Sequence, residues 1–387
     1  MQKMKIGIII VNFYPTRGGA EDYAYFLAKG LSKDKENEVH VFCSSDRDSE
    51  EKIEEIKVHR CKTKFKLTYY LHFFPSLTKK LKEYPLDVIH VIGIGFPQYD
   101  IAINSYLKAY PNTKIVCTPH GPFMALNKYS LFKSLLKSMY MPFLKKNLSK
   151  YHLMIQDNPF QEKWMIQDYK IPKEKIVFIP IGLPEENFKS VPKSSREKVY
   201  SKYNLKNKFL ISYTGRIQKY KGLDQMIKIL PDLIKINKDI LFLAIGKDVG
   251  DRTRLEKLAK ELGVFNHIRF TSQVSEQEKL ALLDLSEIFI FPSEWEAFGI
   301  VMLEAMARKN AIIYTRTEGG RFLIKDRENG LLFDYQNTKE LLKTFLILLK
   351  NRSILDRIQK ENVKKAEKLR WKYIIQKFKN EYSNLLK

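Results

Sequence analysis

The chain has 387 residues, more than one ordinary domain core needs and enough for two domains of typical size. Hydrophobic residues make up 44% of it and charged residues 29%, a composition that excludes a fibre or a disordered chain. Lysine and arginine outnumber aspartate and glutamate by 68 to 44, which gives a net charge of +24. A field of that sign favours polyanionic partners, namely nucleic acid, an anionic membrane or phosphorylated ligands.

Neither a membrane span nor a disulfide framework is expected. No run approaches 18 uncharged apolar residues, and the longest apolar stretches have the length of strands. The start, MQKMKIGIII, lacks a small-residue cleavage site and leads into a helical pattern, so we interpret it as the first strand of a domain. Cys43, Cys61 and Cys117 are scattered and odd in number, which is typical of a reduced, cytoplasmic protein and offers no zinc spacing.

The first half of the chain alternates short apolar runs with amphipathic segments. The runs KIGIIIVNF, EVHVFCS, DVIHVIG, KIVCTP and YHLMIQ are apolar throughout, as in a parallel sheet that is covered on both faces. Helical patterns between them predict repeated strand–helix–strand units. Around IPIGLPEENF, Pro180, Gly182 and Pro184 punctuate the chain, and the polar residues 189–206 that follow favour a domain junction.

A second alternating series follows this junction. FLISYTG, ILFLAIG, IRFTSQ, IFIFPS and AIIYT predict a second parallel sheet, with helices between the strands and a helical stretch from about Thr338 onward. We therefore expect an α/β protein with two doubly wound, Rossmann-like domains, residues 1–185 and 195–365, that face one another across a cleft. The helix 370–387 is expected to pack back on the first domain. Ligands should bind between the domains, outside the carboxyl ends of the strands.

Two loops at the start of helices have residues that suit phosphate groups. Gly18 and Gly19 follow the first strand, where glycines let the backbone approach a ligand and free helix amides favour an anion. A tight strand-to-helix turn is the alternative explanation. Arg216 and Lys221, in YTGRIQKYKGLD, follow the first strand of the second domain, and two cations in such a loop suit a pyrophosphate. Solvated surface charges are the alternative in a chain so rich in lysine.

The stretch PSEWEAFGIVMLEAMA carries two glutamates, Glu296 in the loop before a predicted helix and Glu304 inside that helix. At about 1.5 Å per residue, they are separated by roughly 12 Å or less, comparable to the distance between the hexose and the ribose of a nucleotide-sugar. The amides of Phe298, Gly299 and Ile300 at the helix start would meet the diphosphate between them. The helix is otherwise apolar, and a carboxylate on a face that should be buried needs a polar partner.

These motifs together resemble a known family. Gly-Gly after the first strand, TPHG at 118–121, TGR…KG at 214–222 and Glu-x7-Glu in EAFGIVMLEAMA stand in the order of the retaining glycosyltransferases of family 4, which have the GT-B fold. The resemblance covers nearly the whole chain and is most specific in the Glu-x7-Glu stretch. It implies transfer of a sugar from a nucleotide-sugar, such as a UDP- or GDP-sugar, to an acceptor bound mainly by the first domain.

The resemblance also implies roles for individual residues. It places the Gly-Gly loop and the two cations against the donor diphosphate, the histidine of TPHG near the sugar, the first glutamate on the sugar and the second on the ribose. The residues expected to bind the donor are Gly18, Gly19, Arg216, Lys221, Glu296, Ala297, Phe298, Gly299, Ile300 and Glu304. The residues expected to take part in catalysis are Glu296, His120, Arg216 and Lys221.

One loop departs from the family's pattern. The family commonly has Gly-Gly-x-Pro-Glu after the next strand, whereas this chain reads EGGRFLIKDRENG. Counting back from Asn329–Gly330 without gaps places Phe322 where the glutamate is expected. The donor contacts of this loop, and with them the sugar preference, are therefore open.

The resemblance implies retention of configuration at the anomeric carbon, with the departing phosphate helping to deprotonate the acceptor. Catalysis then depends on positioning and charge stabilisation, without a dedicated side-chain base, a cofactor or an essential metal. Asp46 and Asp48 form an Asp-x-Asp pattern, the metal signature of the other large glycosyltransferase fold. They stand in a polar, acidic loop early in the chain, so we do not expect them to bind a metal.

Positive charge gathers in two stretches of the first domain. Residues 101–156 contain eight lysines and residues 60–82 contain seven basic residues and five aromatics, and neither stretch has an acidic residue. LFKSLLKSMYMPFLKK sets apolar residues at helical spacing beside lysines, with a kink expected at Pro142. Such a segment suits anionic lipid, with on the order of 1 kcal/mol per cation near the surface; a solvated helix face is the alternative. The residues expected to touch a membrane are Lys62, Lys64, Lys66, Lys133, Lys137, Lys145 and Lys146.

We therefore expect a peripheral enzyme on the inner face of the membrane, with a lipid-linked or membrane-associated glycan as acceptor in cell-envelope or glycan biosynthesis. The expected partners are the donor, the acceptor and the anionic membrane surface. A basic nucleic-acid-binding protein is the rival from another class, but no helix-turn-helix, zinc or ribonucleoprotein signature is present and the aromatics mostly follow apolar patterns. A nucleotide-sugar epimerase on the same fold is a nearer rival, which would consume donor without an acceptor.

Overall fold

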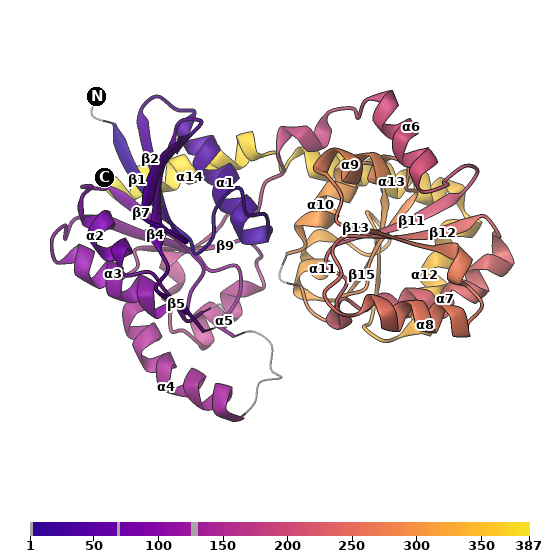
Figure 1. The fold of residues 1–387 in the computed structure, drawn as a ribbon, viewed down its shortest axis with the longest axis horizontal. Coiled ribbons are helices and arrows are strands. Elements are labelled where there is room, and N and C mark those ends of the chain that lie inside the picture. The colour runs from indigo at the N-terminus through magenta and orange to yellow at the C-terminus, as the bar shows by residue number, and fades with distance from the viewer. Residues whose placement is uncertain (1–2, 68–69, 125–130, 297) are drawn as a thin grey trace. The chain divides into compact units, whose positions relative to one another are not determined.

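The protein divides into two compact units. The computed structural model describes residues 3–67, 70–124, 131–296 and 298–387 (Figure 1). The first unit comprises Met1–Gly182 and Trp371–Lys387, and the second comprises Leu183–Arg370, so the chain passes between them twice. The polar residues 189–206, which the sequence favoured as a junction, belong to the second unit and include helix α6 (Lys193–Lys202).

The first unit is built on an eight-stranded sheet in the order β10-β9-β8-β7-β1-β2-β4-β3. All described neighbours in this sheet are parallel except β3 and β4, which form an antiparallel hairpin. The central strand β7 is buried along its whole length, as its uninterrupted apolar run predicts for a sheet with both faces covered. The strands are β1 (Met4–Ile9), β2 (Asn37–Ser45), β3 (Ser49–Ile53), β4 (Ile56–Lys62), β7 (Val88–Ile92), β8 (Lys114–Thr118), β9 (Leu153–Gln156) and β10 (Ile176–Phe178), with a separate pair β5 (Phe65–Lys66) and β6 (His72–Phe73).

Helices connect the strands of the first unit and supply the rest of its core. In the first helix Tyr23, Leu27 and Leu31 recur every four residues, and all three are buried, because that spacing puts them on one face. The helices are α1 (Gly19–Ser32), α2 (Ser76–Lys82), α3 (Pro97–Leu107), α4 (Leu131–Leu148), α5 (Gln161–Gln167) and α14 (Trp371–Leu386), with a 3₁₀ turn at Lys173–Lys175.

Helix α14 contributes to the core of the first unit although it comes from the far end of the sequence. In Figure 1 it is the yellow helix next to α1. A Cβ at Gly30 would overlap the side chain of Ile375, so glycine lets the two helices approach closely. The Tyr382 hydroxyl contacts Nδ1 of the buried His90, whose Nε2 lies 2.8 Å from the Thr118 hydroxyl. Helix α14 is therefore hydrogen-bonded to strand β7, and His90 in turn connects it to β8.

The second unit repeats the architecture with a six-stranded parallel sheet in the order β13-β12-β11-β14-β15-β16. Its strands are β11 (Phe209–Thr214), β12 (Ile240–Ile245), β13 (Ile268–Ser272), β14 (Ile288–Phe291), β15 (Ala311–Thr315) and β16 (Leu331–Phe333). Its helices are α6, α7 (Leu223–Ile236), α8 (Arg252–Glu261), α9 (Glu276–Asp284), α10 (Ile300–Ala307), α11 (Glu318–Leu323), α12 (Thr338–Lys350) and α13 (Arg352–Glu367), with 3₁₀ turns at Glu185–Phe188, Lys219–Lys221 and Phe265–His267. The expectation of two Rossmann-like parallel α/β domains is confirmed.

The order of strands shows where each unit can bind a ligand. The chain reverses its direction of progress across the sheet between β1 and β7 in the first unit and between β11 and β14 in the second. Loops that leave parallel strands beside such a switch point form a crevice at the carboxyl edge of the sheet. The predicted site residues follow β1 and β8 in the first unit and β11 and β14 in the second.

Candidate active site

The loop that leaves β11 carries the two predicted phosphate-binding cations. Its last residue, Gly222, has a left-handed backbone (φ 67°), and a Cβ there would collide with the backbone oxygen of Pro292. Glycine is needed for both reasons, because the conformation and the close approach each exclude a side chain. The loops that follow β11 and β14 therefore pack directly against one another.

Lys221 and Glu296 form an ion pair at the junction of these two loops. Lys221 Nζ lies 2.7 Å from Glu296 Oε2, and Lys221 is only 7% exposed. The ammonium also lies 4.8 Å from the ring centre of Tyr220 and 4.9 Å from that of Phe291, within reach of cation–π attraction. The Glu294 amide donates to the Tyr220 carbonyl at 2.8 Å. The structure therefore brings together two of the predicted residues, from loops 75 positions apart.

Arg216, the other predicted cation of the loop, is exposed, and its Nη2 donates to the Tyr220 hydroxyl at 3.2 Å. Within the described part of the chain it has no ion pair. Its guanidinium is thus presented to solvent, next to the tyrosine that packs on the Lys221 ammonium. The two cations stand in different settings, one exposed and one buried beside a carboxylate.

The start of α10 lies beside Glu296. Gly299 precedes the helix in a left-handed conformation (φ 86°), and Phe298 before it is buried. The Gly319 amide donates to the Glu296 carbonyl at 3.1 Å, and a Cβ at Gly319 would meet the Phe298 backbone oxygen at 2.7 Å. The first-turn amides of α10, from Ile300 on, are therefore fixed next to the ion pair. Ala297, also predicted to bind the donor, lies outside the described residues.

Glu304 is buried on α10, 8% exposed, and has a partner that the sequence interpretation missed. Lys279 of α9 places its Nζ 2.7 Å from Glu304 Oε2 and 2.8 Å from Glu276 Oε1. Burial disfavours the charge on Lys279, but the two carboxylates outweigh it and raise the pKa of the lysine. The need of a buried carboxylate for a cation was the one signal in the sequence that a residue such as Lys279 exists.

The departure at Phe322 has a structural explanation. The segment after β15 forms the short helix α11, whose N-cap Thr317 accepts a hydrogen bond from the Gly320 amide. Phe322 is half-buried, and its ring centre lies 5.7 Å from that of Phe298. A side chain in apolar contact with Phe298, two residues before α10, thus occupies the position where the family carries a glutamate.

In the first unit, Gly18 is the N-cap of α1, with Gly19 as the first helical residue. Gly18 has extended backbone, and a Cβ there would meet the carboxylate of Glu21. Glu21 and Asp22 in the first turn already place negative charge where a diphosphate would lie. Arg17 of the same loop compensates the charge of Asp22, with 2.5 Å between Nε and Oδ1, which leaves Glu21 as the charge that opposes an anion there.

His120 follows β8 with a left-handed backbone (φ 57°). Its Nδ1 lies 2.7 Å from Asp157 Oδ2, in the loop after β9. The ring of Tyr23 packs edge-on against it, with 4.4 Å between ring centres. The imidazole is therefore held on two sides by residues from α1 and from the neighbouring strand's loop.

The residues predicted to touch a membrane fall into two groups in the first unit. Lys62 ends β4, and Lys64 and Lys66 lie at the β5–β6 pair, where Phe65 and Leu67 are exposed. The other four lie on α4: Lys133, Lys137, Lys145 and Lys146. On that helix Leu135, Met139 and Phe143, spaced four residues apart, are 58%, 63% and 66% exposed. No helix among the described residues is long and apolar enough to cross a bilayer.

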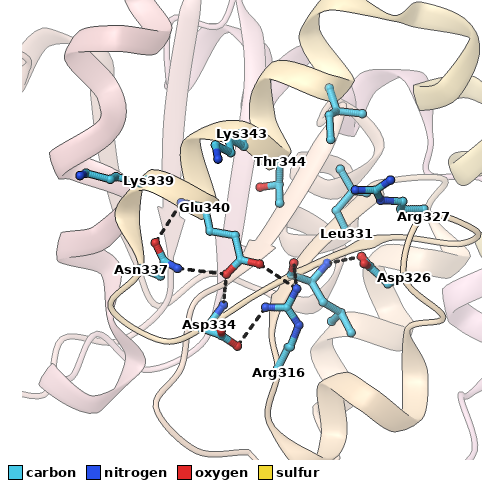
Figure 2. A pocket seen from close by; sticks show the side chains of 12 residues that line it. Arg316, Asp326, Arg327, Leu331, Asp334, Asn337, Lys339, Glu340, Lys343 and Thr344 are labelled. Carbon is cyan, nitrogen blue, oxygen red and sulfur yellow. Dashed lines mark hydrogen bonds and ion pairs between the residues drawn. The ribbon is translucent and has the colours of Figure 1, made fainter.

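A surface pocket of about 510 Å³ lies elsewhere in the second unit, between β16 and the start of α12 (Figure 2). Figure 2 shows Arg316 bound to both Asp334 and Glu340, at 2.9 and 2.7 Å. The charged groups at its centre thus compensate one another, and the predicted site residues are not among those that line it.

Two doubly wound sheets of mostly parallel strands define an α/β protein with two Rossmann-like units, and the second unit places the Lys221–Glu296 ion pair at its switch point. A family model described as Glycosyl transferases group 1 matches residues 195–366, and one described as Glycosyltransferase Family 4 matches residues 17–187. The chain therefore belongs to the family-4 type of glycosyltransferases with the GT-B fold.

Individual relatives agree with this membership. An uncharacterized glycosyltransferase of Methanocaldococcus jannaschii is 25% identical over the whole of both chains. A phosphatidyl-myo-inositol mannosyltransferase of Mycobacterium leprae is 24% identical over 68% of each chain. Among solved structures, HepE of Anabaena in complex with UDP and glucose superposes with a TM-score of 0.76 at 17% identity, over 98% of this chain and all of that one, which shows the shared fold.

Proposed function

We propose that the protein is a retaining, metal-independent glycosyltransferase that uses a nucleotide-sugar, such as a UDP- or GDP-sugar, and no further cofactor. The observation that carries this proposal is the Lys221–Glu296 pair beside the start of α10. It offers a cation for the diphosphate, a carboxylate for sugar hydroxyls and helix amides for the phosphate oxygens, all within one small region. The complex of the similar HepE with UDP and glucose supports this donor class.

The arrangement of charges supports a role in leaving-group stabilisation. Arg216 is exposed with its guanidinium fork available, and Lys221 is buried against two aromatic rings, where water screens its charge little. Both would oppose the negative charge that develops on the departing diphosphate. The acceptor hydroxyl would lose its proton to that phosphate, so no side-chain base is assigned.

Donor binding would redistribute the contacts of the ion pair. Lys221 lies 2.7 Å from Glu296, and a diphosphate, which carries more negative charge than one carboxylate, would compete for that lysine. Glu296 would then accept hydrogen bonds from sugar hydroxyls, while Lys279, 2.7 Å from Glu304, would hold that carboxylate in place for the ribose. His120 of the first unit would contact the sugar, and Gly18 and Gly19 the diphosphate.

We infer further that the acceptor is lipid-linked or membrane-associated, in cell-envelope or glycan biosynthesis. Helix α4 exposes an apolar stripe beside lysines, and the β5–β6 pair exposes apolar side chains beside Lys64 and Lys66. Lysine-flanked apolar surface is the composition that lies on anionic lipid. The relative from Mycobacterium leprae, which is named for transfer to phosphatidyl-myo-inositol, supports this class of acceptor.

A thermal-shift screen over UDP-, GDP- and ADP-sugars, followed by transfer assays on the hits, tests the donor. Binding raises the melting temperature by an amount that depends on ligand concentration and affinity. We expect stabilisation by at least one nucleotide-sugar, lost in Lys221→Met, and a product with retained anomeric configuration by NMR. Conversion of the donor to its epimer without acceptor would instead identify an epimerase, and an inverted product would refute retention.

Flotation with vesicles tests the membrane. We expect the protein to float with vesicles that contain about one third anionic lipid and to remain free of neutral ones at moderate salt. Transfer to a soluble acceptor, without any binding to anionic vesicles, would refute the membrane part and leave the donor part intact.

A further inference from the structure

The contact between His120 and Asp157 is more than a surface ion pair. Asp157 is 1% exposed, and its Oδ2 lies 2.7 Å from His120 Nδ1. Strands β8 and β9 are parallel neighbours, so the loops that follow them meet at one edge of the sheet. A buried carboxylate is costly unless its oxygens are hydrogen-bonded. The buried carboxylate of Asp157 is therefore placed where it fixes the imidazole ring of His120.

The other oxygen of Asp157 is also occupied. Gln161, the first residue of α5, donates its Nε2 to Asp157 Oδ1 at 2.7 Å, and its Oε1 accepts from the Asp157 amide at 3.2 Å. Gln161 is likewise buried. This reciprocal pair of hydrogen bonds orients the carboxylate of Asp157. The Oδ2 atom that faces His120 can only accept a hydrogen bond, so Nδ1 must donate one.

The remaining ring nitrogen has a different environment. His120 Nε2 is shielded from solvent and has no hydrogen-bond partner among the described residues. A buried polar atom without a partner is rare in a native protein and calls for a functional explanation. Because Nδ1 must donate to Asp157, a neutral ring carries its lone pair on Nε2.

We propose that Asp157 is a positioning residue that keeps the His120 proton on Nδ1, so that Nε2 accepts a hydrogen bond from a substrate hydroxyl. This inference rests on the proposed contact of His120 with the sugar. Gln161 is part of the device, because it fixes which oxygen of Asp157 faces the ring. The ligand class is a polyhydroxylated sugar, one of whose hydroxyl groups would donate the hydrogen bond that Nε2 lacks.

The geometry predicts the effect of Asp157→Asn. The amide of Gln161 needs an acceptor, so the asparagine must turn its oxygen toward Gln161 and its NH2 group toward His120. The ring would then carry its proton on Nε2 and lose its acceptor there. In the double variant Asp157→Asn with Gln161→Met the asparagine is free to turn its oxygen to His120, which restores the original tautomer.

The experiment combines kinetics with nitrogen-15 NMR of the histidine rings, whose long-range proton–nitrogen correlations report the tautomer. Comparison with His120→Ala assigns the signal. We expect D157N to lower kcat by about 10² or more, with KM little changed and the ring proton on Nε2. The double variant should recover at least about tenfold and return the proton to Nδ1. Asp168→Asn, an exposed aspartate just after α5, is the matched control and should change neither.

The outcomes separate the two proposals. Wild-type transfer by D157N, or a double variant as slow as D157N although its ring proton is on Nδ1, would overturn the role of Asp157. Wild-type transfer by His120→Ala would overturn the contact of His120 with the substrate, whatever the tautomer. Melting temperatures measured alongside identify variants whose loss of activity comes from unfolding.

Discussion

The predicted functional regions of the two units treat charge in opposite ways. At the candidate site of the second unit two cations lie on carboxylates, the buried Lys221 on Glu296 and the half-buried Lys279 on Glu304. On α4 of the first unit, cations stand beside exposed Met139 and Phe143 in a stretch of chain without a single acidic residue. A lysine that is paired with a carboxylate can exchange this partner for a small anion that binds at one fixed position. Lysines that are spread over an exposed apolar area suit an extended anionic surface instead. In the proposed function this difference corresponds to donor binding in the second unit and acceptor binding in the first.

The largest expected effect concerns the paired charges. Glu296→Gln should lower kcat by at least about 10², because an amide accepts hydrogen bonds from sugar hydroxyls less strongly and leaves Lys221 without its counter-charge. Initial rates and donor affinity measure it. Glu294→Gln, an exposed glutamate of the same loop, is the control and should stay within about twofold of wild type. Equal rates for both variants would contradict the assignment of Glu296.

The second pair should affect stability as well as donor affinity. Lys279→Met leaves Glu304 buried without its cation, and Glu304→Gln leaves the lysine with Glu276 alone; each should cost on the order of 3 kcal/mol. Urea unfolding of both single variants and the double variant measures the coupling. We expect the double variant to lose less stability than the two singles together. Strict additivity would show that the two side chains do not interact.

A third difference between the units is their response to acid, because six of the seven histidines lie in the first unit. Burial lowers the pKa of His40 to about 4, although Glu38 opposes this, and burial lowers the pKa of His90 to about 3. Unfolded histidines titrate near 6.5, so below that pH the unfolded chain binds more protons. The stability that these neutral, buried histidines contribute is thus fully present above about pH 6.5 and is lost as the pH falls toward 4.

The expected loss is about 3 kcal/mol for His40 alone. Two neighbouring groups also make the first unit less stable in acid. Hydrogen bonds from Lys57 and His40 lower the pKa of Glu38 to about 2, and burial lowers the pKa of the adjacent His59. Hydrogen exchange at pH 7 and pH 5 should show amides of the first unit losing protection before those of the second. His40→Gln should flatten this dependence, and simultaneous loss in both units would contradict it.

The smallest effect is expected for the exposed lysines of α4. Neutralising Lys145 and Lys146 with glutamine should weaken binding to anionic vesicles by about fivefold per lysine, since each contributes on the order of 1 kcal/mol. Co-sedimentation at two salt concentrations measures it. Lys360→Gln with Lys364→Gln, on α13 of the second unit, is the matched control of equal charge change. The same loss in both pairs would mean that net charge acts, rather than α4.

Much of this fold could be predicted because its strands are apolar along their whole length. β3 escaped prediction, because SEEKI has neither an apolar run nor clear alternation and lies at the edge of the sheet. α11 escaped because Gly319 and Gly320 are typical of a loop, while Thr317 supplies the cap that starts a helix there.

The candidate site was predictable only in its motifs. Loop position identified Arg216 and Lys221, and spacing identified Glu296 and Glu304, but not the partner of any of them. Asp157 follows a different strand from His120, and Lys279 lies on a different helix from Glu304. A single sequence contains no signal for such pairs beyond the need of a buried charge for a counter-charge.

The position of α14 has a consequence for biosynthesis. The first unit is incomplete until Tyr382 has been translated, although nine tenths of its residues are synthesised before the second unit begins. Until then His90 and the face of α1 at Gly30 lack their cover. We therefore expect the second unit, which is continuous in sequence, to reach its native state on the ribosome first, and the order of maturation to run opposite to the order of synthesis.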